Sequence, residues 1–449
     1  MDDSSASQKA NNQSPADQLP SMAYRSWFLF VLVLVSASVV GERFMMAVMV
    51  GPIKAELKLS DTEIGLAKDM AIAIVYIIAV LPLARLADRW SKRKIVAISA
   101  AIWSVAVLIC GAAKTFWMLL IGRAAIGLGE GGFTPPSQSW IADHFPVRQR
   151  ATAMAVFLLG ASLGNFMGPA VGGWLTHNYG WREAMFFACI PGFILVPIVW
   201  FTLRDVRPGL ADNVSKEDAE IQPFMATVKQ LLAIRTMPLL MISAALNTLI
   251  TMGIVSWAPA FMERSHGMSA QTAGIQMGGA LFLGSVIGHT VGGPLSDYLG
   301  KRDLRWYIWM GMIAGALAMG IAYLALSAPT NAVFPMLGLN MLIGGMSAAP
   351  LLAVISGLAP AHSRSVAVAL LMIAINVIGL GFGPVFVGWL SDMLTPTYGK
   401  EALGIAMRCI LLVGIPSTFL AYLASRSCRG DFERAGGWSA GSSVSAVVH

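Results

Sequence analysis

The sequence has little charge for its length. Only 12% of its 449 residues are Asp, Glu, Lys or Arg, whereas soluble domains carry about 25%. The apolar residues are also gathered into runs, of which 95–113 and 311–346 contain no charge at all. Runs of roughly 18 apolar residues or more are typical of membrane-spanning helices, because a helix satisfies its own backbone polar groups in hydrocarbon. The scarcity of charge therefore excludes an ordinary soluble domain.

Cysteine and histidine are also scarce, and neither is arranged for chemistry. The four cysteines and six histidines are scattered along the chain, without the close spacing of a metal site or a disulfide framework. No Ser-His-Asp grouping is suggested, and the sequence has no Gly-x-x-x-x-Gly-Lys-Ser/Thr motif for a nucleotide phosphate. We therefore expect no metal, no cofactor and no ATP hydrolysis, and we disfavour a membrane-embedded enzyme.

Acidic residues are fewer than basic ones, which gives a formal net charge of +7. Most basic residues fall in alternate short turns between the apolar runs, as Arg85, Lys94 and Arg305 do. The positive-inside rule places such turns in the cytosol. We therefore expect no nucleic-acid partner. We expect instead an integral multi-pass protein of the bacterial inner (cytoplasmic) membrane, with both termini in the cytosol.

The apolar runs and the polar turns between them predict an all-α membrane protein with twelve transmembrane helices. The longest polar stretch inside the chain contains Lys216-Glu217-Asp218 and marks a boundary between two halves. We predict cytosolic tails over 1–24 and 427–449, which we interpret as disordered, six-helix bundles over 25–203 and 238–426, and a cytosolic linker over 204–237. The predicted spans are 26–50, 64–86, 95–113, 116–142, 152–175, 183–203, 238–261, 272–295, 306–326, 333–358, 366–390 and 403–425.

The two halves repeat each other's motifs. The turn after the second span, 84–93, is matched by 293–302 after the eighth, and the glycine-rich stretch 164–175 of the fifth span is matched by 379–390 of the eleventh. Both matches have nearly the same separation along the chain, which indicates a duplicated six-helix unit. Membrane transporters are commonly built from such repeats, with the substrate near the membrane midplane between them.

These motifs resemble those of the major facilitator superfamily. Its loop signature, Gly-x-x-x-Asp-Arg-x-Gly-Arg-Arg, is matched by 84–93, with Ala84 and Ser91 in place of glycines, and again by 293–302. Its fourth-span signature, Arg-x-x-x-Gly-x-Gly, is matched by 123–129, and its fifth-span glycine signature by 164–173. The resemblance covers nearly all of 25–426. It implies two pseudo-symmetric six-helix bundles and transport by alternating access.

Within that superfamily, the N-terminal half is similar to the Spinster-like transporters. The similar stretches are 41–43, 52–61, 82–94, 122–130 and 140–146. Two positions depart from the family pattern, because Glu42 replaces the usual Asp and the second span opens with the charged pair Lys68-Asp69. The resemblance implies a lysophospholipid-like or sphingolipid-like substrate and the lipid bilayer as surroundings. We expect a monomer.

Four ionisable residues inside the spans are the candidates for proton coupling and substrate binding: Glu42, Arg43, Arg123 and Glu130. Arg123 and Glu130 are separated by about two helical turns and so share a face of the fourth span. Ionisable residues at such depth usually face a cavity or a partner, and the resemblance places spans one and four beside the central cavity. Burial raises the pKa of a carboxyl and a nearby Arg lowers it. The alternative is a static salt-bridge lattice.

A second candidate group lies at the predicted cytosolic face. The resemblance implies that Asp88 and Asp297 each lie beside the N-terminal end of a helix of the other half, where the helix dipole would hold an acidic side chain and latch a gate. Arg89, Arg93 and Arg302 belong to the same two turns. The alternative for these basic residues is that they only fix the topology.

The remaining candidates have weaker signals. Lys68 and Asp69 are possible cavity contacts, although we favour an ion pair that snorkels to the outer surface. Asn247, Asn340 and Asn376 could contact substrate or bond between helices, and His289 is expected to be a packing residue. Small residues and prolines allow close helix approach or a kink, so we predict either hinge or packing roles for Gly164, Gly168, Pro169, Gly383 and Pro384.

The leading hypothesis is a proton-linked secondary transporter for an amphiphilic lipid-like or organic-anion substrate. A charged head would bind the N-terminal half, and an apolar tail would lie on the C-terminal half, whose cavity we expect to lack charges. A proton-driven exporter of drugs or metabolites is the alternative within transport. A transporter-like receptor keeps the fold but would not need Arg123 and Glu130, so it is disfavoured.

Overall fold

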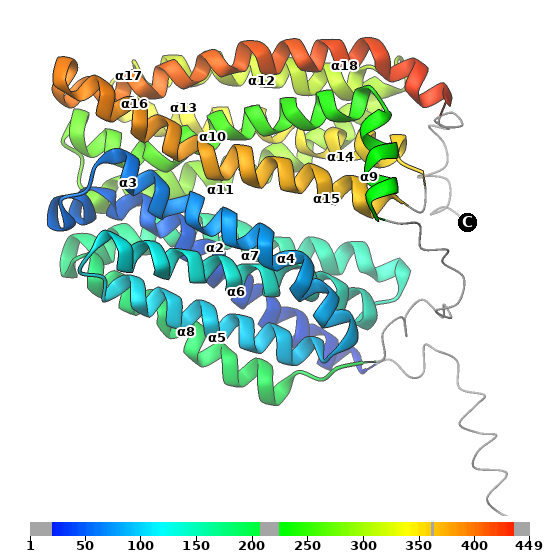
Figure 1. Cartoon of the computed structure of the whole chain (residues 1–449), viewed down its shortest axis with the longest axis horizontal. Helices are drawn as coiled ribbons and strands as arrows, with labels where there is room; N and C mark the ends of the chain where they lie inside the picture. Colours follow the sequence, from blue (N-terminus) through cyan, green and yellow to red (C-terminus); the bar gives the residue numbers. More distant parts are fainter. Residues whose placement is uncertain (1–19, 207–223, 361–362, 435–449) are drawn as a thin grey trace, which may run out of the picture.

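The chain folds as an all-helical membrane protein (Figure 1). The computed structural model describes residues 20–206, 224–360 and 363–434. Within them, nine segments are long and apolar enough to cross a membrane, and the last of these, Val366–Arg434, is two spans separated at Gly399, whose φ is 54°. Helices α6 (Phe116–His144) and α11 (Ala270–Gly300) are also long enough. The charged and small residues of α6 and α11 lower the mean hydropathy of these two helices without shortening them. With these two helices, the described part has the twelve spans that the sequence predicts.

The elements of the first half follow one another with short turns. Ser21 caps the first long helix, and Ser60 with Glu63 forms a reciprocal capping box at the start of the second span. A π-helical turn, η2, interrupts that span. The elements are α2 (Met22–Leu57), α3 (Asp61–Gly65), η2 (Leu66–Met70), α4 (Ala71–Arg89), α5 (Lys92–Gly111), α6, α7 (Val147–Tyr179) and α8 (Trp181–Thr202).

The second half begins with a short helix, α9 (Phe224–Ala233), inside the segment that the sequence predicts to be a linker. Its last helix continues past the predicted span to Arg434. The eleventh span contains a second π-helical turn, η4. The elements are α10 (Thr236–His266), α11, α12 (Trp306–Ala325), α13 (Thr330–Gly345), α14 (Ala348–Leu358), α15 (Arg364–Ala374), η4 (Ile375–Gly381), α16 (Phe382–Tyr398), η5 (Gly399–Glu401), α17 (Ala402–Cys409), η6 (Ile410–Val413) and α18 (Gly414–Arg434).

The two halves lie side by side. Figure 1 shows α2 to α8 in one group and α10 to α18 in the other, with α3 and α9 at opposite ends of the molecule. Close backbone contacts between the halves occur where Gly274 of α11 meets Pro169 of α7, and where Gly388 of α16 meets Asp61 of α3. Both contacts belong to the end of the molecule that contains α3. We call it the α3 end.

Large apolar side chains cover much of the outer surface. Ile78 is 68% exposed, Trp117 67% and Phe201 79%. In water such a surface would promote association, whereas in a bilayer it faces lipid tails. The exposure pattern therefore agrees with a chain that spans the membrane.

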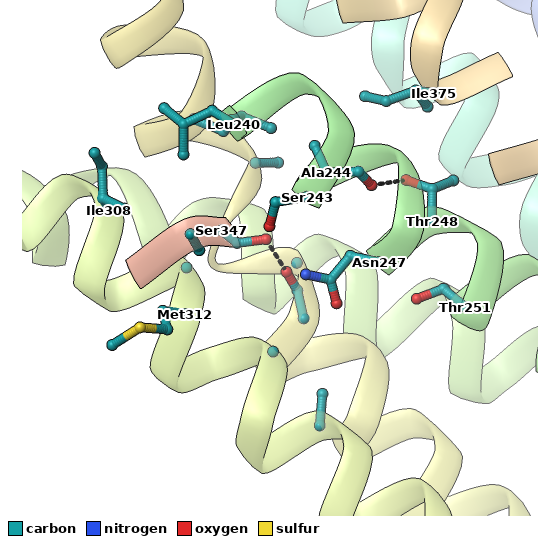
Figure 2. Close-up of a pocket in the computed structure, with 18 of the residues that line it drawn as sticks. Leu240, Ser243, Ala244, Asn247, Thr248, Thr251, Ile308, Met312, Ser347 and Ile375 are labelled. Carbon is teal, nitrogen blue, oxygen red and sulfur yellow. Dashed lines mark hydrogen bonds between the residues drawn. The ribbon is translucent and has the colours of Figure 1, made fainter. Parts of the chain in front are cut away.

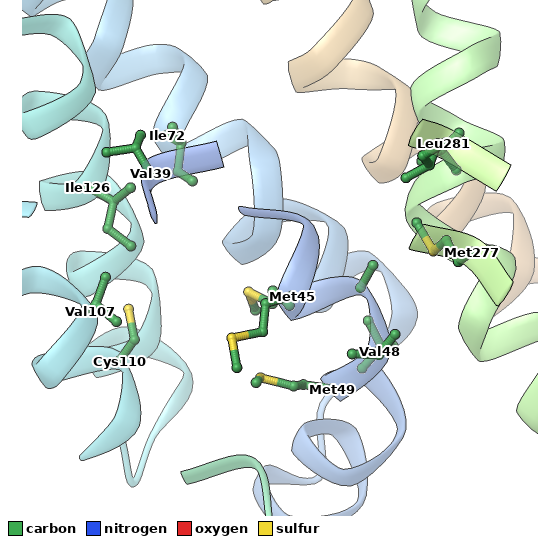
Figure 3. Close-up of a cluster of buried hydrophobic side chains, with 14 of the residues drawn as sticks. Val39, Met45, Val48, Met49, Ile72, Val107, Cys110, Ile126, Met277 and Leu281 are labelled. Carbon is green, nitrogen blue, oxygen red and sulfur yellow. The ribbon is translucent and has the colours of Figure 1, made fainter. Parts of the chain in front are cut away.

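Helix α2 runs through the middle of the buried core. Figure 3 shows Met45 and Met49 of α2 between Val107 of α5 on one side and Met277 of α11 on the other. Methionine adapts its shape to irregular gaps. The helix that carries Glu42 and Arg43 is therefore held by apolar packing against both halves.

Candidate functional site

Six charged side chains meet inside the first half, at the level where η2 replaces a regular helical turn. Three are basic and three acidic, so the cluster is formally balanced. All are buried except Arg43, whose side chain is 17% exposed. The cluster contains the four residues predicted to act together and the unusual pair of the second span: Glu42 and Arg43 from α2, Lys68 and Asp69 from η2, and Arg123 and Glu130 from α6.

The first ion pair of the cluster joins α6 to α2. Arg123 Nη1 donates a hydrogen bond to Glu42 Oε1, and both side chains are shielded from solvent. Arg123 also donates to the backbone oxygen of Lys68, over 2.8 Å from Nη2 and 3.3 Å from Nε. The second oxygen of Glu42, Oε2, is buried and has no hydrogen-bond partner among the described residues. In this pair, Arg123 donates from three of its nitrogens, whereas only one of the two Glu42 carboxylate oxygens accepts a hydrogen bond from a described residue.

The second ion pair is longer and more accessible. Arg43 Nη1 lies 3.4 Å from Glu130 Oε2, and Arg43 Nε lies 3.5 Å from Asp69 Oδ1. Charge-assisted hydrogen bonds are usually about 2.7–2.9 Å long, so neither contact is at full strength. Arg43 is shared between two carboxylates, and its partial exposure leaves it open to a further anion.

The pair Lys68 and Asp69 is buried, so its interpretation as an ion pair that snorkels to the surface is wrong. Lys68 Nζ donates to Ser256 Oγ over 2.6 Å and to the Ser256 backbone oxygen over 2.8 Å. Ser256 Oγ donates in turn to Asp69 Oδ2 over 2.9 Å. Ser256 belongs to α10, so these bonds join the charged cluster to the second half. The sequence analysis missed Ser256, which no motif marks.

A second polar link between the halves was also missed. Arg264 of α10 donates two hydrogen bonds of 2.8 Å to the two carboxylate oxygens of Asp61 at the start of α3. Lys54 Nζ and Ser391 Oγ donate to the same carboxylate, over 2.6 and 2.8 Å. Asp61 is buried, and both of its carboxylate oxygens accept hydrogen bonds, so this link holds the two halves together at the α3 end.

Asp392 of α16 caps a helix of the other half. Its carboxylate accepts from the backbone N–H groups of Asp61 and Thr62, over 2.9 and 2.8 Å, and from the Thr62 hydroxyl over 2.6 Å. The N-terminal turn of a helix is partly positive and holds an acidic group. This is the kind of contact predicted for Asp88 and Asp297, found at the opposite end of the molecule.

The predicted gate residues at the α9 end do not bridge the halves in the described part of the chain. Asp297 accepts a hydrogen bond of 2.8 Å from Tyr307 of its own half, and Arg302 lies over the Tyr298 ring. The backbone N–H of Arg93 donates to Asp205 over 2.9 Å. The side chains of Asp88 and Arg89 lie outside the described part, so their gating role stays a prediction.

A cavity of about 320 Å³ lies inside the second half. Its lining offers hydroxyl and amide groups but, among the described residues, no Asp, Glu, Lys or Arg. Figure 2 shows Asn247 of α10 between Ser243 and Thr251, with its amide directed inward. His289 also lines the cavity and is exposed to it, so the expectation of a packing histidine is wrong.

The three predicted asparagines have different surroundings. Asn340 lines the cavity but donates to the Ala318 backbone oxygen over 2.6 Å, which ties α13 to α12. Asn247 donates to Ser417 over 3.2 Å and keeps its oxygen toward the cavity. Asn376 donates to Met372 of its own helix and is not part of the cavity wall. Asn247 is therefore the best placed of the three to contact a ligand.

The predicted glycines and prolines lie where helix backbones touch. A Cβ on Gly168 would come within 2.1 Å of the Gly41 oxygen, and one on Gly164 within 2.7 Å of the Ala37 oxygen. A Cβ on Gly383 would lie 2.5 Å from the Leu249 oxygen. Pro169 touches Gly274, and the Pro384 oxygen accepts from Trp257 over 2.9 Å. All these contacts are those of close packing, and a hinge role stays a prediction.

Comparison with known proteins agrees with this architecture. The model of the family described as Major Facilitator Superfamily matches residues 31–384. An MFS-type efflux pump of Mycolicibacterium smegmatis is 29% identical over 91% of this chain and 94% of its own, and Protein spinster homolog 1 of Xenopus tropicalis is 23% identical over 84% and 76%. The crystal structure of a bacterial homolog of the human lysosomal transporter Spinster, inward-facing and unoccupied, has a TM-score of 0.84 at 25% identity, covering 94% of this chain and 100% of that one.

Proposed function

This chain belongs to the Major Facilitator Superfamily, and we propose that it is a proton-coupled secondary transporter of an amphiphilic lipid-like molecule or organic anion. Its membership makes it a multi-pass membrane transporter rather than an enzyme. We further propose that residues 25–203 and 238–426 form the two bundles that alternate access to the site between them. The α9 end, which carries the basic turns, then faces the cytosol.

The inequality of the two ion pairs supports Glu130 as the proton-coupling carboxylate. The Arg123–Glu42 pair is buried and tight, whereas the Arg43–Glu130 pair is 3.4 Å long with a partly exposed arginine. A proton on Glu130 releases Arg43 to bind an anion, and an anion at Arg43 removes the charge that keeps Glu130 ionised. Proton and substrate binding are thereby linked. Glu42 is the second candidate, because its Oε2 is buried without a partner.

The distribution of charge supports an amphiphile. Arg43 offers a cation in the first half, while the cavity of the second half offers uncharged groups. The two are connected along α10, since Met252 lines the cavity and Ser256, one turn further, bonds to Lys68. An anionic head near Arg43 would leave a tail within the cavity. A relative from Arabidopsis thaliana, 28% identical over 37% of this chain, is named a probable sphingolipid transporter, which agrees with a lipid-like substrate.

An exporter is the second candidate function. The relative from Mycolicibacterium smegmatis is named an efflux pump, and its match covers nearly the whole of both chains. Export and lipid transport would use the same charged cluster and the same cavity. They differ in the molecule carried and in the direction of net movement.

Transport by the purified protein in liposomes tests the proposal. Uptake of a radiolabelled lysophospholipid would be followed with and without an imposed proton gradient, beside a panel of organic anions and cationic drugs. We expect gradient-dependent uptake of an anionic amphiphile. Movement of cationic drugs alone would support the exporter, and gradient-independent movement of every compound by folded protein would contradict proton coupling.

A further inference from the structure

We propose that Asp69 and Ser256 transmit the charge state of Glu130 to the contact between the two halves, with Arg43 as the intermediate. This inference rests on the proposed function, since it assigns the step that follows protonation. It makes the charged pair of the second span a coupling element rather than a surface ion pair.

The contacts form one continuous chain across the interface. Glu130 of α6 contacts Arg43 of α2 at 3.4 Å, and Arg43 contacts Asp69 of η2 at 3.5 Å. Asp69 accepts from Ser256 of α10 over 2.9 Å. Every member is buried except Arg43, so water competes little with these contacts. The chain begins at a titratable group in one half and ends on a helix of the other.

Arg43 is placed to divide its charge between two carboxylates. Its distances to Glu130 and Asp69 differ by little, so neither partner holds it alone. When Glu130 takes a proton and no anion is bound at Arg43, its attraction for Arg43 falls and Arg43 pairs with Asp69 more strongly. Asp69 then accepts less well from Ser256.

Ser256 is the residue through which this change reaches the second half. Its hydroxyl accepts from Lys68 and donates to Asp69, so a single hydroxyl bonds to two adjacent side chains of η2. Both of these side chains belong to the π-helical turn η2, and both reach Ser256 of α10. Weakening the Asp69 bond therefore weakens the link between η2 and α10, and protonation favours opening of the α3 end.

Other groups near Glu130 do not provide an equivalent route. The charged and titratable side chains that act on it in the described part are Arg43, Glu42, Arg123 and Tyr76. The last three belong to the first half and have no described hydrogen bond to the second. Arg123 donates to the backbone oxygen of Lys68, whose side chain bonds to Ser256, so that route passes through the backbone of η2. Among the described bonds, the contact through Arg43 and Asp69 is the one that continues from side chain to side chain as far as α10.

The test measures opening of the α3 end as a function of pH. Lys58→Cys and Lys400→Cys, both exposed and in different halves, would carry spin labels after replacement of the four native cysteines. The distance distribution between the labels would be recorded between pH 5 and 8 in nanodiscs, with pH values chosen around the usual range for buried carboxyls. We expect wild type to shift toward longer distances at low pH.

The variant Ser256→Ala keeps the backbone oxygen that accepts from Lys68 but removes the hydroxyl, which accepts from Lys68 and donates to Asp69. We expect it to reduce the pH-dependent change in the open-to-closed ratio by about fivefold or more, the lower range of allosteric coupling. Ser256→Thr restores the hydroxyl and should restore the response. Ser104→Ala is the matched control, because Ser104 is a buried serine of α5 that donates to Ala100 of its own helix and lies outside the cavity lining.

The outcomes separate this inference from the proposed function. A response that is present in wild type, lost in Glu130→Gln and unchanged in Ser256→Ala overturns the coupling link and leaves the proton site standing. A response that is absent from wild type, or unchanged in Glu130→Gln, overturns both. Asp69→Asn is the confirming variant, and because it leaves Arg43 with one carboxylate fewer, it is interpreted only beside Ser256→Ala.

Discussion

Arg264 of α10 donates two hydrogen bonds of equal length, 2.8 Å, to Asp61 of α3, one to each carboxylate oxygen. This fork-to-fork geometry is the strongest that a guanidinium makes with a carboxylate. The two residues belong to different halves, so the pair opposes any motion that separates them at the α3 end. Asp392 reinforces it by capping the same helix.

The Arg264→Gln variant should therefore loosen the α3 end. Hydrogen bonds to charged groups contribute about 1.5–3 kcal/mol each, and the partial exposure of Arg264 lowers this figure. We expect the open-to-closed ratio at the α3 end to rise at least about tenfold, measured with the labels at positions 58 and 400. Arg182→Gln is the control, since Arg182 pairs with Glu56 inside the first half. Equal distance distributions in wild type and Arg264→Gln would refute the latch.

The Gly168→Ala variant should reduce stability, because the added methyl group meets the backbone of α2 at 2.1 Å. Backbone cannot move aside as a flexible side chain does, and overpacking of this kind costs about 1–3 kcal/mol. We expect a lower midpoint of thermal unfolding. Gly320→Ala, where no atom lies within 4 Å of the added Cβ, should leave the midpoint unchanged or raise it slightly. A Gly168→Ala protein as stable as wild type would show that the helices separate easily there.

The cavity of the second half can be filled without disturbing its walls. A Cβ on Gly344 meets no atom within 4 Å, and Gly344 lines the cavity. We expect Gly344→Phe to fold normally and to lower amphiphile uptake on the order of tenfold, since a phenyl ring occupies much of a cavity of about 320 Å³. Gly279→Phe is the matched control, because its Cβ is equally free but Gly279 lines a groove formed by α11 and α13 instead. Full uptake by Gly344→Phe would place the substrate elsewhere.

Two of the three carboxylates of the charged cluster, Glu42 and Glu130, should respond differently to amide substitution. Glu42→Gln leaves Arg123 fully buried with an uncompensated charge, and breaking such a pair costs roughly 3–5 kcal/mol. Glu130→Gln leaves Arg43 with Asp69 and partial solvent access, so its effect on stability should stay within about 1 kcal/mol. Thermal unfolding of the two variants in the same detergent compares them. Similar losses of stability would contradict the division into a structural pair and a labile pair.

The sequence predicts the spans and the composition of the cluster, because both leave local signals. Twelve apolar runs are visible directly, and Glu42, Arg43, Arg123 and Glu130 stand out as charges within them. The repeat in the sequence also indicates two related halves. These features depend only on residues close together in the chain or on a family motif.

The contacts between the halves could not be predicted in the same way. Ser256 and Asp392 belong to no sequence motif, and their roles depend on how α10 and α16 pack against η2 and α3. Ser256, for example, lies 188 positions from its partner Lys68 in the chain. The expectation that Lys68 reaches the outer surface is wrong because its partner Ser256 lies on a helix of the other half, for which the second span gives no signal. Arg264 lies in the last turn of α10, and its partner Asp61 begins the second span, 203 positions away in the chain, so no local signal joins them.

The proton-coupling role of Glu130 is the central claim, and the flow of protons during transport tests it most directly. Liposomes that contain a trapped pH-sensitive dye would receive the transported amphiphile in the absence of any other gradient. Proton coupling through Glu130 predicts a pH change inside the liposomes with wild type and none with Glu130→Gln, although the variant is folded and still binds the amphiphile. A pH change of equal size with Glu130→Gln would contradict the account and direct attention to Glu42.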